Sequence, residues 1–178
     1  NQVRFLDKSG NTIFTQAPAC NKDSFDFSRP AFLGEAYLDR NDSLVKEPMN
    51  FTRHNNIPLE DLQQILQSIL FPMSVPVRQR FKLTADDYAF LYRYLSQYPS
   101  ETPWPKYDTS VFYDSYVKFF FRKGGHRIPA FIRVFNKVGW AYGCLTDVSY
   151  VVDFRNRIEF MLTATVYTNE DGILNDDR

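Results

Sequence analysis

Two short stretches place a serine three residues before a lysine, a spacing that brings both side chains onto one turn of a helix. They are Ser43 with Lys46 and Ser115 with Lys118. A serine hydroxyl becomes a nucleophile when a neighbouring base takes its proton, and a lysine serves as that base once burial lowers its pKa. The chemistry therefore needs the serine at the first turn of a buried helix.

Neither match has that context. Ser43 follows a polar turn, and Pro48 ends any helix soon after Lys46. Ser115 falls inside an expected helix over 109–123 rather than at its start. Matches built from two common residue types also arise by chance. We therefore expect neither serine to be the nucleophile.

The remaining reactive residue types are scattered. His54 and His126 have no further ligand at metal-binding spacing, and Cys144 is expected to be a small buried hydrophobe rather than the disulfide partner of Cys20. Net charge is zero, which argues against nucleic acid as a partner, and no run reaches transmembrane length. We expect no cofactor and no metal.

Three consecutive segments alternate apolar and polar residues with period two, over 131–137, 144–154 and 157–168. They are rich in β-branched and aromatic residues, which predicts strands. The short connection over 153–157 implies antiparallel neighbours, and glycines in 139–143 suit a sharp bend. Arg133 lies an even number of residues from Lys137, so it either adds positive charge to an anion site there or pairs with Glu159.

The run Lys137-Val138-Gly139, followed by Tyr142-Gly143 and Asp147, resembles the Lys-Thr-Gly strand of serine β-lactamases and penicillin-binding proteins. The resemblance covers about the last third of the chain, which is similar to the class A β-lactamase branch of these serine hydrolases. It implies that Lys137 binds a substrate carboxylate and that Gly139 leaves the strand edge open to substrate. Val138 replaces the usual hydroxyl residue, which favours a peptide or ester substrate over a β-lactam.

The family also uses a Ser-x-Asn element, and the only match here, Ser9 to Asn11, is expected in a hairpin turn. The chain opens in strand-like sequence without an initiator Met. We therefore expect it to be the C-terminal part of a bacterial serine hydrolase of the periplasm or cell envelope, with the nucleophile on an upstream segment. The alternative is a non-catalytic binding module for a peptide or small ligand.

The other expected elements are a hairpin over 3–16, a short strand over 35–39 and three helices. The first helix begins after Pro58 and ends at Phe71-Pro72, the second is capped by Thr84 and stops before Pro99, and the third spans 109–123. This order suits one incomplete α+β domain, an antiparallel sheet with helices packed on it, as in β-lactamases and transpeptidases. A strand missing from such a sheet leaves an exposed edge, so we expect a partner segment or self-association.

Overall fold

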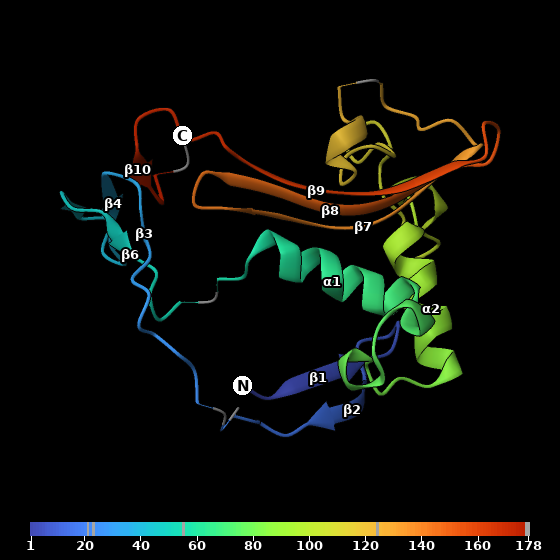
Figure 1. The fold of residues 1–178 in the computed structure, drawn as a ribbon, viewed down its shortest axis with the longest axis horizontal. Coiled ribbons are helices and arrows are strands. Elements are labelled where there is room, and N and C mark those ends of the chain that lie inside the picture. Colours follow the sequence, from blue (N-terminus) through green and yellow to red (C-terminus); the bar gives the residue numbers. More distant parts are fainter. Residues whose placement is uncertain (21, 23, 55, 124, 177–178) are drawn as a thin grey trace.

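The central feature of the computed structural model is a three-stranded antiparallel sheet, in the order β7-β8-β9 (Figure 1). Its strands are β7 (Ile132–Ala141), β8 (Cys144–Asp153) and β9 (Ile158–Tyr167). The structure describes residues 1–20, 22, 24–54, 56–123 and 125–176. The predicted three-strand unit is confirmed, but β7 runs past residue 137, so that Lys137, Val138 and Gly139 lie inside the strand.

The turn between β7 and β8 is tighter than the sequence indicated. Only Tyr142 and Gly143 separate the strands, and their φ angles are 52° and 72°. Two successive positive φ values match the twist of a tight hairpin. A Cβ on Gly143 would lie 2.4 Å from that of Asn169, so this position requires glycine.

Helix α1 (Leu59–Leu70) lies across one face of the sheet (Figure 1). Its leucines recur at helical spacing, and Leu66 and Leu70 pack against Val148 of β8 to form a buried cluster. Glu60 and Asp61 occupy the first turn, where acidic side chains interact favourably with the helix dipole. The prediction of this helix is confirmed.

Helix α2 (Ala85–Ser96) begins with a full capping box. The Thr84 hydroxyl accepts a hydrogen bond from the backbone N–H of Asp87, and the Asp87 carboxylate accepts one from the backbone N–H of Thr84. The helix packs on β7, and the Tyr92 hydroxyl donates to the carbonyl of Leu70 at the end of α1. The predicted cap and helix are therefore confirmed.

The expected third helix over 109–123 is wrong. The segment consists of turns with one short 3-10 helix, η4 (Phe119–Phe121), and another, η3 (Pro99–Glu101), precedes it. In an α-helix the N–H of Phe119 would bind the carbonyl of Ser115, but here it donates to the Asp147 carboxylate on β8 at 2.9 Å. Asp108 similarly accepts from the N–H of Ser110. Side-chain acceptors thus replace the helical hydrogen bonds.

This turn-rich segment covers part of the second face of the sheet. There Val134 and Val151 form a second buried cluster with Tyr98 and Ile128. The Tyr98 hydroxyl donates to the carbonyl of Ile132 at 2.9 Å. The core therefore has two layers, one on each face of β7 and β8.

The remaining strands form small separate sheets. Strand β4 (Ala36–Leu38), near the predicted strand over 35–39, lies between β5 (Leu44–Val45) and β10 (Ile173–Leu174), and β3 (Phe32–Leu33) pairs with β6 (Met49–Asn50). The predicted N-terminal hairpin is confirmed as β1 (Val3–Leu6) and β2 (Thr12–Gln16), and all residues of both strands are exposed. Short 3-10 helices η1 (Pro72–Ser74) and η2 (Val77–Gln79) follow α1. The structure is α+β, with several sheets rather than one.

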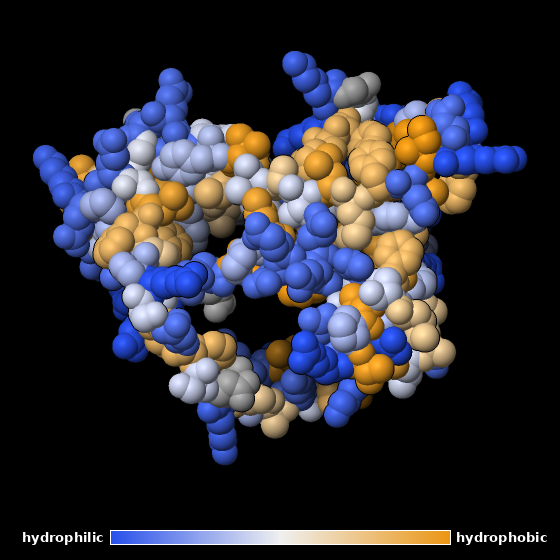
Figure 2. Space-filling view, viewed as in Figure 1, coloured by the Kyte–Doolittle hydropathy of each residue, from blue (hydrophilic) through white to orange (hydrophobic). Residues whose placement is uncertain are grey.

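The molecule exposes far more surface than a compact monomer. Its accessible area is 13706 Å² for a mass of 20.9 kDa, whereas a globular monomer of this mass exposes about 9,000 Å². Figure 2 shows openings between the N-terminal segment and the rest of the molecule, with hydrophobic groups visible on the surface. The exposed area is thus about half as much again as that of a compact monomer.

Candidate functional site

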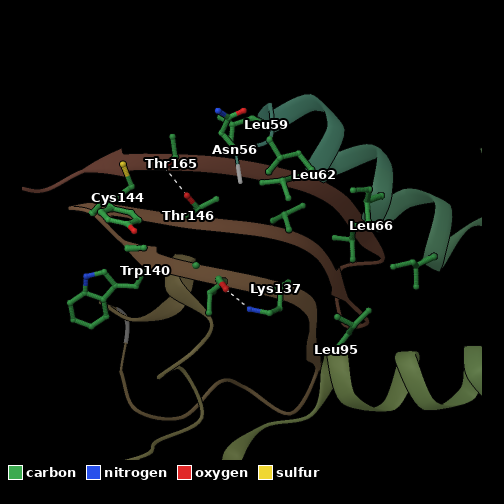
Figure 3. A pocket seen from close by; sticks show the side chains of 18 of the residues that line it. Asn56, Leu59, Leu62, Leu66, Leu95, Lys137, Trp140, Cys144, Thr146 and Thr165 are labelled. Atoms are coloured by element: carbon green, nitrogen blue, oxygen red, sulfur yellow. Dashed lines mark hydrogen bonds between the residues drawn. The ribbon is translucent and has the colours of Figure 1, made fainter. Parts of the chain in front are cut away.

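A cavity beside the sheet lies between α1 and the turn-proximal ends of β7, β8 and β9 (Figure 3). Its volume is about 600 Å³, within the range of sites for small ligands. Aliphatic side chains of α1, among them Leu59, Leu62 and Leu66, form one wall. The sheet forms the other wall, where the hydroxyls of Thr146 and Thr165 hydrogen-bond across β8 and β9 at 2.8 Å.

All three residues of the predicted binding motif line this cavity. Lys137, Val138 and Gly139 lie on β7, one of the two outer strands of the sheet, and no strand in the described part of the chain pairs with its outer edge. Lys137 and Gly139 are exposed. The ammonium group of Lys137 donates a hydrogen bond to the carbonyl of Val138. A Cβ on Gly139 would meet only Thr146, at 4.0 Å, so the face of the sheet is open at this position.

The second Ser-x-x-Lys match proves to be a buried structural element. Ser115 is 0% exposed and donates its hydroxyl hydrogen bond to the carbonyl of Gly125. Lys118 is 2% exposed and donates to three oxygens, the carbonyls of Leu95 and Val134 and the side-chain oxygen of Asn136, at 2.8, 3.0 and 2.6 Å. Because each group has its own partners, Lys118 is not placed to act as a base for Ser115.

Asn136 links the Lys118 ammonium to a buried carboxylate. Its amide donates to Asp147 at 2.9 Å and to the carbonyl of Val117 at 2.8 Å, and the Ser149 hydroxyl also donates to Asp147 at 2.7 Å. Every buried side-chain polar atom in the described residues has a partner. This network attaches the turn-rich segment to β7 and β8 at the residue that precedes Lys137.

Burial is the main electrostatic influence on this network. Desolvation lowers the pKa of Lys118 to about 8, against an attraction from Asp147 that raises it. Desolvation likewise raises the pKa of Asp147, although hydrogen bonds from Asn136 and Ser149 act in the opposite direction. Sequence reasoning missed this network because a lysine in an expected helix gives no sign of burial. The signal in the sequence that could have revealed the network is the pair Asn136 and Asp147, which are polar residues within strands of the core.

The other predicted residues lie outside the cavity or in its wall. Ser43 is exposed in a turn where its N–H donates to Asp39, and Ser9 is in the predicted hairpin turn. Cys144 is half-buried in the cavity wall, and burial raises the pKa of its thiol, which keeps it protonated. Cys20 is an exposed free thiol.

Arg133 resolves the alternatives that the sequence left open. It forms an ion pair with Glu101 at 2.7 Å and lies over the ring of Tyr98. It does not pair with Glu159, and it does not line the cavity. The hydrogen bond that Arg133 donates to the Glu101 carboxylate raises the pKa of Arg133. Glu159 instead accepts a hydrogen bond from the Tyr150 hydroxyl. Of the two basic residues on β7, only Lys137 is available to a ligand in the cavity.

The part of the chain that the structure describes has neither a cluster of metal ligands nor a membrane-spanning helix. No group of three or more histidine, cysteine or acidic side chains there is arranged to hold a metal ion. His126 stacks on the ring of Tyr113 at 4.2 Å, and His54 contacts Phe51. No helix among these residues has the length and apolar character needed to cross a membrane.

No protein-family model, curated protein or solved structure matches this chain.

Proposed function

We propose that this chain is the C-terminal, substrate-binding part of a β-lactamase-like serine hydrolase, which acts by acyl transfer through a seryl ester. The observation that carries the proposal is the position of Lys137 and Gly139. Both lie on the unpaired edge of β7 at the border of an apolar cavity of about 600 Å³. A free strand edge binds an extended peptide through backbone hydrogen bonds, and a lysine beside it attracts a carboxylate.

The nucleophile in this proposal comes from an upstream segment outside these residues. Ser43 is exposed in a turn, and Ser115 is buried with its hydroxyl committed to a carbonyl. Neither serine lines the cavity beside Lys137. An attacking hydroxyl and its base must lie within hydrogen-bond reach of each other and of the substrate carbonyl.

The substrate proposed is a peptide or ester with a free carboxylate and an apolar group near it. Val138 offers no hydroxyl to such a carboxylate, so Lys137 supplies its main polar contact. The aliphatic wall of α1 suits an apolar group. A cell-envelope location in a bacterium accompanies this proposal, because the resembled enzymes act on peptides there.

The experiment has two arms. The full-length parent and this chain are incubated separately with a fluorophosphonate, and each intact mass is measured. The proposal expects an adduct on the parent alone. An adduct on this chain would contradict the proposal and indicate that Ser43 or Ser115 is the nucleophile. An adduct on neither protein would contradict serine chemistry.

The second arm measures binding of a fluorescent N-acyl-D-alanyl-D-alanine peptide to this chain. We expect Lys137→Met to weaken binding about tenfold or more, since it removes a charged hydrogen-bond partner. Lys106→Met is the matched control, because Lys106 is exposed and does not line the cavity. Equal affinities for the wild-type protein and K137M would contradict the role of Lys137.

A second candidate is a non-catalytic binding module that uses the same edge and cavity. It is favoured by the absence, among the described residues, of a serine and base facing Lys137. Peptide binding that depends on Lys137, with no adduct on the full-length parent, would select this candidate.

A further inference from the structure

Strand β9 forms the second open edge of the central sheet. It spans Ile158–Tyr167, pairs with β8 on one side, and no strand in the described part of the chain pairs with its other side. Alternate backbone N–H and C=O groups along this edge therefore point away from the sheet. Such a row of groups is a template for another strand.

The side chains of β9 do nothing to block that pairing. One face carries an exposed apolar stripe, which we call the β9 stripe: Ile158, Phe160, Leu162 and Val166, exposed by 54, 46, 40 and 57%. The strand contains no lysine, proline or glycine, and Glu159 is its only charged residue. Lysines, prolines and bulges are the usual means of protecting an edge, and β7 by contrast carries Lys137 and Gly139.

We propose that two copies of this chain associate through their β9 edges, in an antiparallel pair with Leu162 on the two-fold axis. In this register Leu162 faces Leu162 of the second copy, Phe160 faces Ala164, and Ile158 faces Val166. Every residue of the β9 stripe thus gains an apolar cross-strand neighbour, the kind of pair that stabilises antiparallel sheets. The sequence of β9 is self-complementary, as a two-fold interface requires.

The opposite face of the same pairing is also compatible. Met161 faces Thr163 and Glu159 faces Thr165, so no like charges lie opposite each other. The two Glu159 carboxylates are separated by an offset of six positions along the strands, about 20 Å. The result is one continuous sheet in the order β7-β8-β9-β9-β8-β7, with both β7 edges and their cavities outermost and unobstructed.

The exposed area supports a second copy. The chain exposes 13706 Å², about half as much again as a compact monomer of its mass. Obligate dimers bury about 2,000–5,000 Å² in their interfaces. Part of this exposed area lies on β9, where seven of the ten residues are exposed. Because each copy has one β9 edge, the pairing closes at two molecules rather than continuing into a fibre.

The first test is the mass of the particle in solution, measured by light scattering from low to several hundred micromolar protein. We expect about twice the 20.9 kDa chain mass. Leu162→Lys places two ammonium groups opposite each other on the axis and should give monomer at concentrations where the wild-type protein is dimeric. Val77→Lys is the control, because Val77 is 76% exposed on η2, away from β9.

Cross-linking tests the register even if Leu162→Lys disturbs folding. In a background with the exposed Cys20 changed to serine, Leu162→Cys should form a disulfide-linked dimer on mild oxidation, because directly opposite residues have suitable Cα separation. Val166 is more exposed than Leu162, 57% against 40%, but its counterpart lies about 26 Å away in this register, so Val166→Cys should not cross-link. A wild-type monomer throughout the concentration range, or equal cross-linking of both variants, would overturn the proposal.

Discussion

At the scale of single residues, two lysines near β7 have opposite environments and opposite roles. Lys137 is exposed at the border of the cavity, whereas Lys118 is buried with three oxygen partners. A buried ammonium group contributes little net stability, since desolvation offsets its hydrogen bonds, but removing it leaves its partners unsatisfied. Lys118 therefore serves to fix one arrangement of the turn-rich segment on β7.

The buried position of Lys118 predicts a characteristic dependence of stability on pH. Its pKa is about 8 in the folded protein, against 10.5 for an unperturbed lysine. Between these values the unfolded chain binds a proton that the folded chain has released. The contribution of Lys118 to the free energy of unfolding should therefore rise with pH, by up to about 1.4 kcal/mol per unit. Below pH 8 the contribution should not change.

The measurement is urea unfolding of the wild-type protein and Lys118→Met between about pH 7.5 and pH 9.5, below the range where tyrosines titrate. We expect the variant to be less stable by about 3 kcal/mol at the lower pH, because three acceptors lose their donor. The difference should widen as the pH rises. Lys106→Met, which changes an exposed lysine, is the control. Parallel profiles for the wild-type protein and K118M would show that Lys118 does not titrate in this range.

At the scale of elements, the sequence predicts correctly the helices and strands whose hydrogen bonds join residues close together along the chain. Helix α2 is an example, because its beginning is fixed by the reciprocal bonds of Thr84 and Asp87, three residues apart. The segment over 109–123 has helical spacing of its aromatic residues but forms turns. Its competing hydrogen bonds go to Asp147, which is distant in sequence and close only in the folded protein.

The capping box predicts a measurable contribution of Thr84 to stability. Thr84→Ala should lower the free energy of unfolding by about 1 kcal/mol, since the N–H of Asp87 loses its acceptor. Thr84→Ser, which keeps the hydroxyl, should have close to wild-type stability. Chemical denaturation followed by circular dichroism compares the three proteins. A serine variant as unstable as the alanine variant would indicate that the threonine methyl group, rather than the cap, is responsible.

At the scale of the whole molecule, the chain has a well-packed centre and an unusually exposed periphery. Val134 is fully buried between the sheet and its covering segment, while the β1–β2 hairpin is exposed throughout. An isolated two-stranded hairpin is only marginally stable in water. The stability of the monomer therefore resides in the apolar clusters of the β7–β9 sheet with α1 and α2.

Association through β9 predicts a concentration-dependent melting temperature. Because dimerisation stabilises only the folded state, raising the protein concentration a hundredfold should raise the melting temperature of the wild-type protein by several degrees. Leu162→Lys should melt at a temperature independent of concentration. Calorimetry at matched scan rates measures both. A wild-type melting temperature that does not change with concentration would argue against a folded dimer.

The sequence alone determined the α+β class, the β7–β9 hairpins, helices α1 and α2, and the position of Lys137 on a strand, whereas only the structure placed Gly139 inside that strand. These features follow from period-two alternation, helical spacing and caps, all of which act between residues near in sequence. Only the tertiary structure decided that Lys118 is buried, that Arg133 pairs with Glu101, and that residues 109–123 form turns. Each depends on a partner far along the chain, and the local pattern carries no information about which distant acceptor will be present.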